Sequence, residues 1–175
     1  HPRHHPPPSL GSRRTMTPPP VDPVEEVRGE VLVLFHYQDV PAPRHTLGKV
    51  DWYLAGAVSR LAVDGKFTGG VGSAALFHPS GKFQVEKILV LGLGPRAGVN
   101  PSTLQSAARH LRSLLHDLHA RDACIVVPDS PDTRAQAVID LFSATLRREQ
   151  SAAPPTITFL ADEDEGRPGS WGQAR

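Results

Sequence analysis

The stretch KILVLGLG (residues 87–94) decides the fold, because a continuous apolar run ends there in a glycine turn. Such a run is typical of a strand buried on both faces, as in a parallel sheet covered by helices on each side. Two further runs, EVLVLFHY (30–37) and ACIVV (123–127), have the same character, and TITFL (156–160) predicts a last strand. The sequence therefore predicts several buried strands spread along the whole chain.

One pair of strands is predicted to be a hairpin. Residues 69–77 and 83–91 both read as strands, and the turn signal HPSG (78–81) lies between them. A short connection of this kind joins antiparallel neighbours. The sheet is therefore expected to be mixed, with one antiparallel strand.

Three helices are predicted from apolar spacing. The first spans residues 47–62. The second opens at Asn100-Pro101, because Asn is a strong N-cap and Pro suits the first helical position. Ser130-Pro131 repeats that start and predicts the third. The resulting order, β-α-β-β-α-β-α-β, indicates an α/β layered domain around a largely parallel sheet.

Composition divides the chain into three parts. The hydrophobic fraction of 39% is low for a globular chain, but the deficit lies mostly in the ends. Residues 1–29 are rich in proline and are expected to be disordered, with Met16 a candidate for the natural start. Residues 30–161 form the predicted α/β domain, and residues 162–175 a mobile acidic and glycine-rich tail.

Charge and cysteine content limit the possible partners. The net charge of +1 gives no global electrostatic case for nucleic acid. Cys124 is the only cysteine, so no internal disulfide can form, and a cytoplasmic location is expected. No apolar run approaches the length needed to cross a bilayer, so no membrane partner is expected.

Three motifs in a fixed order resemble a known family. DWYLAGAVS (51–59), GKFTG (65–69) and KILVLGLG (87–94) resemble the N-terminal domain of the leucyl aminopeptidase family, peptidase family M17. The resemblance implies a macro-domain-like three-layer fold, with a mixed, mostly parallel sheet flanked by helices. That family carries its metals and catalytic residues in a C-terminal domain, so the resemblance implies a non-catalytic chain without a cofactor or metal.

The resemblance leaves three functions open. The first is a free-standing, non-catalytic protein that acts through a protein partner or self-association, in a regulatory or assembly role, with a peptidase as one candidate partner. The second is a binder of ADP-ribose or a nucleotide, as in macro-like folds elsewhere. The third is a fragment or split half of a metallo-aminopeptidase of family M17.

Two sets of residues are candidates for binding. Trp52, Tyr53 and Phe67 are predicted interface residues if they are exposed, because aromatic side chains dominate interface energetics. The glycine segment after residue 91 is a weak phosphate-loop candidate that departs from the usual spacing, and a tight turn at the strand exit is the favoured interpretation. Its glycines are Gly92, Gly94 and Gly98.

Four other features are weighed and not assigned a chemical function. The segment DEDEGR (162–167) echoes a metal-binding motif of the family's catalytic domain, but a solvated acidic tail is favoured. His116 and His119 are expected to be polar positions near a helix end, and Cys124 an inert buried thiol. Five arginines could form a basic face, although solvated helix faces are favoured: Arg109, Arg112, Arg121, Arg147 and Arg148.

Overall fold

The computed structural model describes residues 24–40, 43, 45–79, 83–130, 132–147 and 154–162. Its strands are β1 (Arg28–His36), β2 (Ala74–Phe77), β3 (Gln84–Gly92), β4 (Asp122–Val126) and β5 (Thr156–Leu160). Its helices are α2 (His45–Tyr53), α3 (Ala57–Val63), α4 (Pro101–Asp117) and α5 (Ala135–Arg147), with short 3-10 turns η1 (Val24–Glu26) and η2 (Arg96–Gly98).

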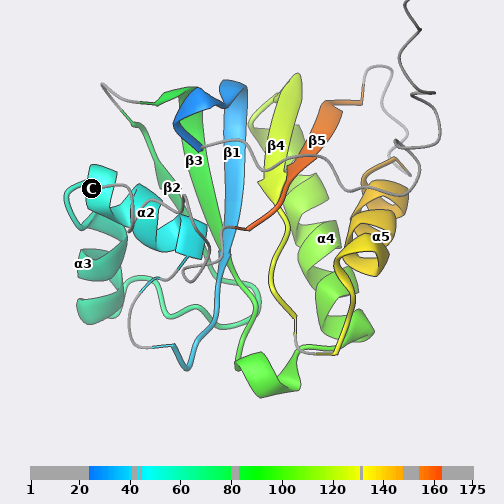
Figure 1. Cartoon of the computed structure of the whole chain (residues 1–175), viewed down its shortest axis with the longest axis horizontal. Helices are drawn as coiled ribbons and strands as arrows, with labels where there is room; N and C mark the ends of the chain where they lie inside the picture. The colour runs from blue at the N-terminus through cyan, green and yellow to red at the C-terminus, as the bar shows by residue number, and fades with distance from the viewer. Residues whose placement is uncertain are drawn as a thin grey trace, which may run out of the picture.

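The five strands form one sheet in the order β2-β3-β1-β4-β5 (Figure 1). The pairs β1–β3, β1–β4 and β4–β5 are parallel, and β2 is antiparallel to β3. This confirms the predicted mixed, mostly parallel sheet with one hairpin strand.

Helices cover the sheet on both faces, which makes three layers (Figure 1). Val31 and Val33 of β1 face the core formed with α4 and α5. Leu32 and Leu34, one residue out of step, face the core formed with α2 and α3. This alternation follows from the period of two along a strand, and it explains why β1 is continuously apolar from Val31 to Phe35.

The predicted helix over 47–62 is wrong in one respect, because the chain forms two helices there. Ala55 and Gly56 have positive φ values of 58° and 79°, which end α2 and redirect the chain. Asp51 Oδ1 then accepts hydrogen bonds from the amides of Val58 at 2.7 Å and Ser59 at 3.1 Å. The motif DWYLAGAVS therefore encodes a helix break whose second helix is capped by a buried carboxylate.

The start of α4 is confirmed, whereas the predicted start of α5 is wrong. Asn100 Oδ1 accepts a hydrogen bond from the Thr103 amide at 2.9 Å, and Pro101 is the first residue of α4. Ser130 instead forms an isolated β-bridge with Thr133, and α5 begins only at Ala135. Pro131 lies outside the described residues.

Both ends of the folded region extend beyond the expected boundaries. Val24 is buried, and Glu25 forms an ion pair with Lys49 at 3.0 Å, so the ordered chain includes residues that were expected to be disordered. At the other end, Asp162 is hydrogen-bonded to α2 and is no part of a solvated tail. Residues 1–23 and 163–175 lie outside the described residues.

The strand predicted over 69–77 is shorter, and its glycines have another use. A Cβ on Gly92 would lie 2.3 Å from the Gly70 carbonyl oxygen, so the chain before β2 passes directly against the end of β3. Regular pairing begins only at Ala74. The glycines at 69, 70 and 92 thus permit a close approach of two backbones.

Candidate functional site

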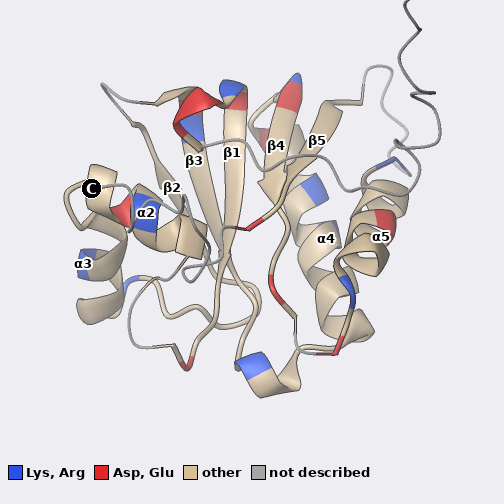
Figure 2. Cartoon of the chain, in the orientation of Figure 1, with Lys and Arg blue, Asp and Glu red and all other residues tan. Residues whose placement is uncertain are grey.

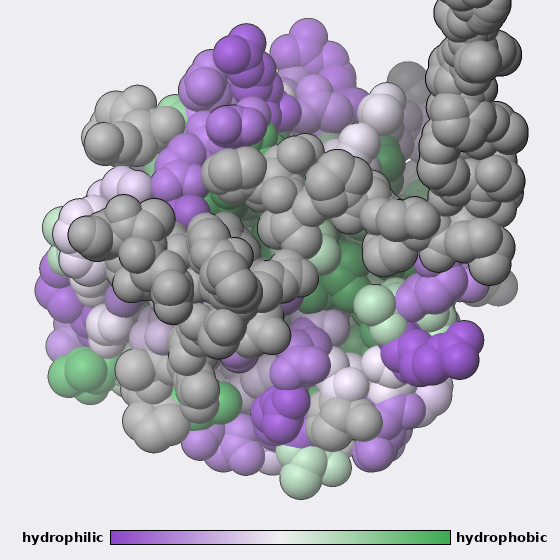
Figure 3. All heavy atoms as spheres, viewed as in Figure 1, coloured by the Kyte–Doolittle hydropathy of each residue, from purple (hydrophilic) through white to green (hydrophobic). Residues whose placement is uncertain are grey.

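A cavity of about 250 Å³ lies at the carboxyl ends of β1 and β4. The end of β1 and the segment after β4 form its walls, and α2, η2 and Asp162 complete it. Figure 3 shows hydrophobic surface near the end of β5, on the face that carries α2 and α3. The apolar lining residues are Leu34, Phe35, Val40, Leu47, Val126, Val127 and Pro128.

The topology explains why a cavity forms at this edge. After β1 the chain turns to α2 on one face of the sheet, and after β4 it leads to α5 on the other face (Figure 1). Because the neighbouring strands β1 and β4 send the chain in opposite directions, a crevice opens between their carboxyl ends. Ligands of open α/β sheets bind at this kind of position.

Three residues form a linked polar group at the cavity. Arg96 Nη2 lies 2.6 Å from Asp129 Oδ2. The Tyr37 hydroxyl donates a hydrogen bond to the Asp129 carbonyl oxygen, and the Arg96 guanidinium carbon lies 5.8 Å from the centre of the Tyr37 ring. The Arg96 amide donates to Asp39 Oδ1 at 3.0 Å, which ties η2 to the loop after β1.

Burial and charge change the ionisation of these groups. Burial, and then the Asp129 carboxylate, raise the pKa of Tyr37 to about 12, so the phenol remains protonated at neutral pH. Burial lowers the pKa of His36 below its ordinary value, against the opposing effect of Asp51. The hydrogen bond to Asp129 raises the pKa of Arg96. At neutral pH this site therefore holds a neutral phenol beside an ion pair.

The N-terminus of α2 forms another wall. Asp162 Oδ1 accepts a hydrogen bond from the Thr46 amide at 3.0 Å, so a carboxylate from the far end of the domain lies at the positive end of this helix. His45, which also lines the cavity, has a φ of 57°. The backbone thus adopts an uncommon conformation where α2 meets the cavity.

The glycine segment is not built as a phosphate cradle. The Gly92 amide donates to the Ser73 carbonyl at 2.9 Å, and the Gly94 amide to the Gly69 carbonyl at 2.8 Å. The Gly98 amide donates to the Pro95 carbonyl at 3.0 Å. A phosphate loop needs amides that point at the ligand, and these three are engaged by the fold. The segment is the tight turn that the sequence favours.

The three predicted interface residues have different environments. Trp52 is 64% exposed, so it meets the condition of exposure for an interface residue. Tyr53 is half-buried, and its hydroxyl donates to Glu25 Oε2 at 2.9 Å. Phe67 is only 1% exposed and packs beside His36, so it belongs to the core and does not meet the condition of exposure for an interface residue.

The basic residues do not form one face. Arg112 donates to the Thr145 carbonyl oxygen at 3.2 Å, while Arg121 pairs with Glu30 at the opposite end of the parallel strands from the cavity. Arg109 and Arg147 are exposed, and Arg148 lies outside the described residues. A single basic nucleic-acid surface is therefore not built from these residues.

The remaining predicted features have simple positions. His116 and His119 are exposed at the end of α4, and Cys124 is buried in β4. Among the described residues, no group of three or more His, Cys, Asp or Glu side chains could hold a metal ion. Within the same part of the chain, every helix is too short or too polar to cross a bilayer.

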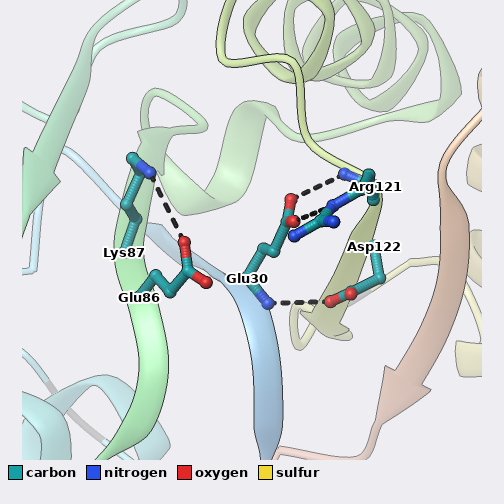
Figure 4. Close-up of polar contacts among 5 residues, drawn as sticks. All are labelled: Glu30, Glu86, Lys87, Arg121 and Asp122. Carbon is teal, nitrogen blue, oxygen red and sulfur yellow. Dashed lines mark hydrogen bonds and ion pairs between the residues drawn. The ribbon is translucent and has the colours of Figure 1, made fainter.

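A second polar cluster at the amino ends of the strands is a structural joint (Figure 4). The Glu30 carboxylate accepts hydrogen bonds from the Arg121 amide at 2.7 Å and from the Arg121 guanidinium, and Asp122 Oδ1 accepts from the Glu30 amide at 2.8 Å. These bonds join the start of β1 to the start of β4. The hydrogen bond from the Arg121 amide is the main cause of the lowered pKa of Glu30.

The family model for the N-terminal domain of the cytosol aminopeptidase family matches residues 31–149. The chain belongs to this family. The match is to the N-terminal domain, which is not the catalytic domain. The resemblance carried by residues 51–59, 65–69 and 87–94 is thereby confirmed.

Curated relatives support the same assignment. A probable cytosol aminopeptidase of Geobacter sp. (strain M21) is 35% identical over 126 residues, which cover 66% of this chain and 26% of that protein. One from Cyanothece sp. (strain PCC 7425 / ATCC 29141) is 24% identical, over 69% of this chain and 25% of that protein. The chain thus spans about a quarter of the length of these family members.

Solved structures confirm the macro-like three-layer fold. A mutant of tomato leucine aminopeptidase superposes with a TM-score of 0.57 at 16% identity, covering 81% of this chain and 31% of that chain. A mutant macrodomain of Oceanobacillus iheyensis gives a TM-score of 0.64 at 9% identity, covering 83% of both chains. The macrodomain of Trypanosoma brucei in complex with ADP-ribose gives 0.58 at 17% identity, covering 79% of this chain and 60% of that chain.

Proposed function

We propose that this aminopeptidase-family domain is a non-catalytic, cytoplasmic protein-interaction module, with Trp52 at the centre of its contact surface. The observation that carries the proposal is the 64% exposure of this large aromatic side chain on α2. Soluble domains bury most of the surface of such residues, and tryptophan is enriched among interface hot spots. The partner is a second protein, a peptidase of the same family or another copy of this chain.

The surroundings of Trp52 suit this role because they hold it in place. The Tyr53 ring packs edge-on against Trp52, with the ring centres 5.2 Å apart. The Tyr53 hydroxyl is bound by Glu25, and Glu25 is paired with Lys49, whose side chain is 7% exposed. A side chain supported by such a network loses less conformational entropy on binding than a mobile one.

The test compares Trp52→Ala with Val63→Ala. Val63 is 85% exposed on α3, so its variant controls for loss of an exposed apolar side chain near the same surface. Partners are recovered from the native host with each tagged protein, and self-association is measured by sedimentation. We expect Trp52→Ala to weaken association by about 2 kcal/mol or more, which is about thirtyfold, with little effect of Val63→Ala. Equal recovery by Trp52→Ala and wild type would refute the role of this residue.

The same proposal includes the absence of aminopeptidase activity from the isolated chain. Metal-activated water is the reagent of this hydrolysis, and the described residues contain no cluster suited to a metal. Hydrolysis of leucine p-nitroanilide with added manganese or zinc should not exceed the rate without protein. Turnover that survives repurification and stops with chelator would favour the third alternative, a piece of a metallo-aminopeptidase.

ADP-ribose binding is the second candidate function. The cavity at the carboxyl ends of β1 and β4, and the likeness to a macrodomain solved with ADP-ribose, favour it. The engaged amides of the glycine segment argue against it, because they leave no cradle for a diphosphate there. Calorimetry with ADP-ribose, ATP and NAD should show weak or no binding. A dissociation constant of about 1 μM, equivalent to about −8 kcal/mol, would place this function first.

A further inference from the structure

A positively charged side chain of the protein itself, that of Arg96, lies at the cavity and is paired with a carboxylate. Its guanidinium group lies between the Asp129 carboxylate, at 2.6 Å, and the Tyr37 ring, whose centre is 5.8 Å from the guanidinium carbon. The Tyr37 hydroxyl also bonds to the Asp129 carbonyl oxygen, which holds the ring and the carboxylate-bearing loop together. A carboxylate beside an aromatic face is an arrangement that recognises organic cations.

The charge of the lining favours a cation over an anion. Asp129 and Asp162 line the cavity, whereas Arg96 is its single Lys or Arg among the described residues. Asp39, which binds the Arg96 amide, adds a further carboxylate nearby. Figure 2 shows acidic segments after β1, β4 and β5 at this end of the sheet. Among the described residues, a ligand phosphate would meet more negative than positive charge here.

The size and walls of the cavity limit the ligand further. Its volume of about 250 Å³ lies below the roughly 300–1,000 Å³ of pockets for drug-sized molecules. Seven of the thirteen lining residues are apolar, and they include Leu34, Leu47 and Val126. The matching ligand is therefore small, with an apolar body attached to its charged group.

Arg96 can be displaced from its position. The Arg96 side chain is 43% exposed and that of Asp129 is 54% exposed. Ion pairs between exposed side chains contribute only about 0–1 kcal/mol. A cation that also buries an apolar body in the cavity gains more than the water-exposed pair loses.

We propose that this cavity binds a small amine with an apolar body, whose ammonium group replaces the Arg96 guanidinium between Asp129 and Tyr37. Arg96 then acts as an internal competitor that closes the cavity when no ligand is present. The site lies apart from Trp52 on the surface of α2, so this inference does not depend on the proposed protein-interaction role.

The first experiment varies only the charge of the ligand. The full chain is titrated with 2-phenylethylamine, with the neutral 2-phenylethanol and with the anion phenylacetate, and backbone amide shifts are followed by NMR. We expect the amine to bind best and phenylacetate worst, with shifts at Tyr37, Arg96 and Asp129. Equal binding of all three, or preference for phenylacetate, would overturn the proposal.

The second experiment varies the competitor. Removing the Arg96 side chain in Arg96→Ala should tighten amine binding by up to about fivefold, the equivalent of an exposed ion pair of about 1 kcal/mol. Arg96→Gln should act in the same direction. Arg109→Ala, which removes the same charge from the exposed face of α4, should leave the affinity unchanged.

The third variant removes the acceptor. Asp129→Asn should abolish the preference for 2-phenylethylamine over 2-phenylethanol, with binding of the neutral alcohol retained as proof that the cavity is intact. Weaker amine binding in both Arg96 variants would show that Arg96 contributes to the site, and would overturn the proposal. An undiminished amine preference in Asp129→Asn would overturn it as well.

Discussion

Replacement of Asp51 by alanine tests how the motif DWYLAGAVS holds the helix break. Asp51 is 8% exposed, and its carboxylate accepts the amides of Val58 and Ser59 and, at 2.5 Å, the Ser59 hydroxyl. Loss of an N-cap costs about 0.5–2 kcal/mol, and a buried hydrogen bond to a charged group contributes about 1.5–3 kcal/mol. Since the three bonds share one side chain and are not additive, we expect a loss of about 3 kcal/mol in the free energy of unfolding.

Thermal unfolding followed by circular dichroism measures this loss. A change of 1 kcal/mol lowers Tm by about 2–4 °C in a domain of this size, so Asp51→Ala should melt about 6–12 °C below wild type. Asp51→Asn retains an oxygen acceptor for the two amides and should lose about half as much. The smaller loss of the amide variant would separate the hydrogen bonds from the negative charge.

Asp64→Ala is the matched control, because Asp64 is an exposed aspartate at the other end of α3. Its free energy of unfolding should change by no more than about 0.5 kcal/mol. If Asp51→Ala melts within about 2 °C of wild type, the carboxylate does not hold the second helix and the reasoning fails.

Three further predictions concern the site and the ends of the fold. Because the pKa of Tyr37 is raised to about 12 in the folded chain, stability should be complete below pH 10 and fall between pH 10 and 12, and Tyr37→Phe should flatten that part of the urea-unfolding profile. A chain beginning at residue 30 should melt at a lower temperature than one beginning at residue 24, because it lacks the buried Val24 of η1. Burial of such a side chain contributes about 1.5–3 kcal/mol. Equal melting temperatures would show that η1 does not pack against the domain. Gly92→Ala places a Cβ 2.3 Å from the Gly70 carbonyl oxygen and should lower the free energy of unfolding by about 3 kcal/mol or more, measured by chemical unfolding. Gly98→Ala is the control and should be nearly neutral, because nothing lies within 4 Å of its added Cβ. Comparable losses in the two variants would contradict the close approach.

The strands and their faces could be predicted from the sequence because they depend on local pattern. Continuous apolar runs predict β1, β3 and β4, and the structure buries both faces of each within the two cores. The Asn100-Pro101 start of α4 is also a local signal, since the cap bonds a residue only three positions away. Where an apolar run or a cap residue contains the cause, the prediction succeeds.

Predictions failed where apolar spacing does not contain the cause, either because a local turn interrupts a helix or because a distant contact decides the outcome. The break between α2 and α3 depends on whether the chain turns at Ala55, and apolar spacing continues through that point. Phe67 looks like any aromatic candidate for an interface until the fold places it against His36. Asp162 lies 116 positions from the Thr46 amide that it binds. The local sequence shows only that Asp162 begins an acidic segment, and this predicts a solvated tail.

The cavity residues were missed for a related reason, although a usable signal exists. Tyr37 directly follows β1, and Asp129 follows β4 by three residues. Parallel strands bring their carboxyl ends to one edge of a sheet, so polar residues after each predicted strand are candidates for one site. Arg96 could not be found in this way, because its position depends on how η2 folds back after β3.

The use of the glycine segment links the fold to the chemistry of the cavity. In this chain the backbone of β3 is pressed against residues 69 and 70, and the amides of Gly92 and Gly94 are consumed by that contact. Because these amides are engaged, the glycine segment cannot offer them to a phosphate, whereas carboxylates lie after the neighbouring strands. We therefore expect the close approach of residues 69 and 70 to β3 to favour cations over anions at this edge, and the amine series tests that consequence directly.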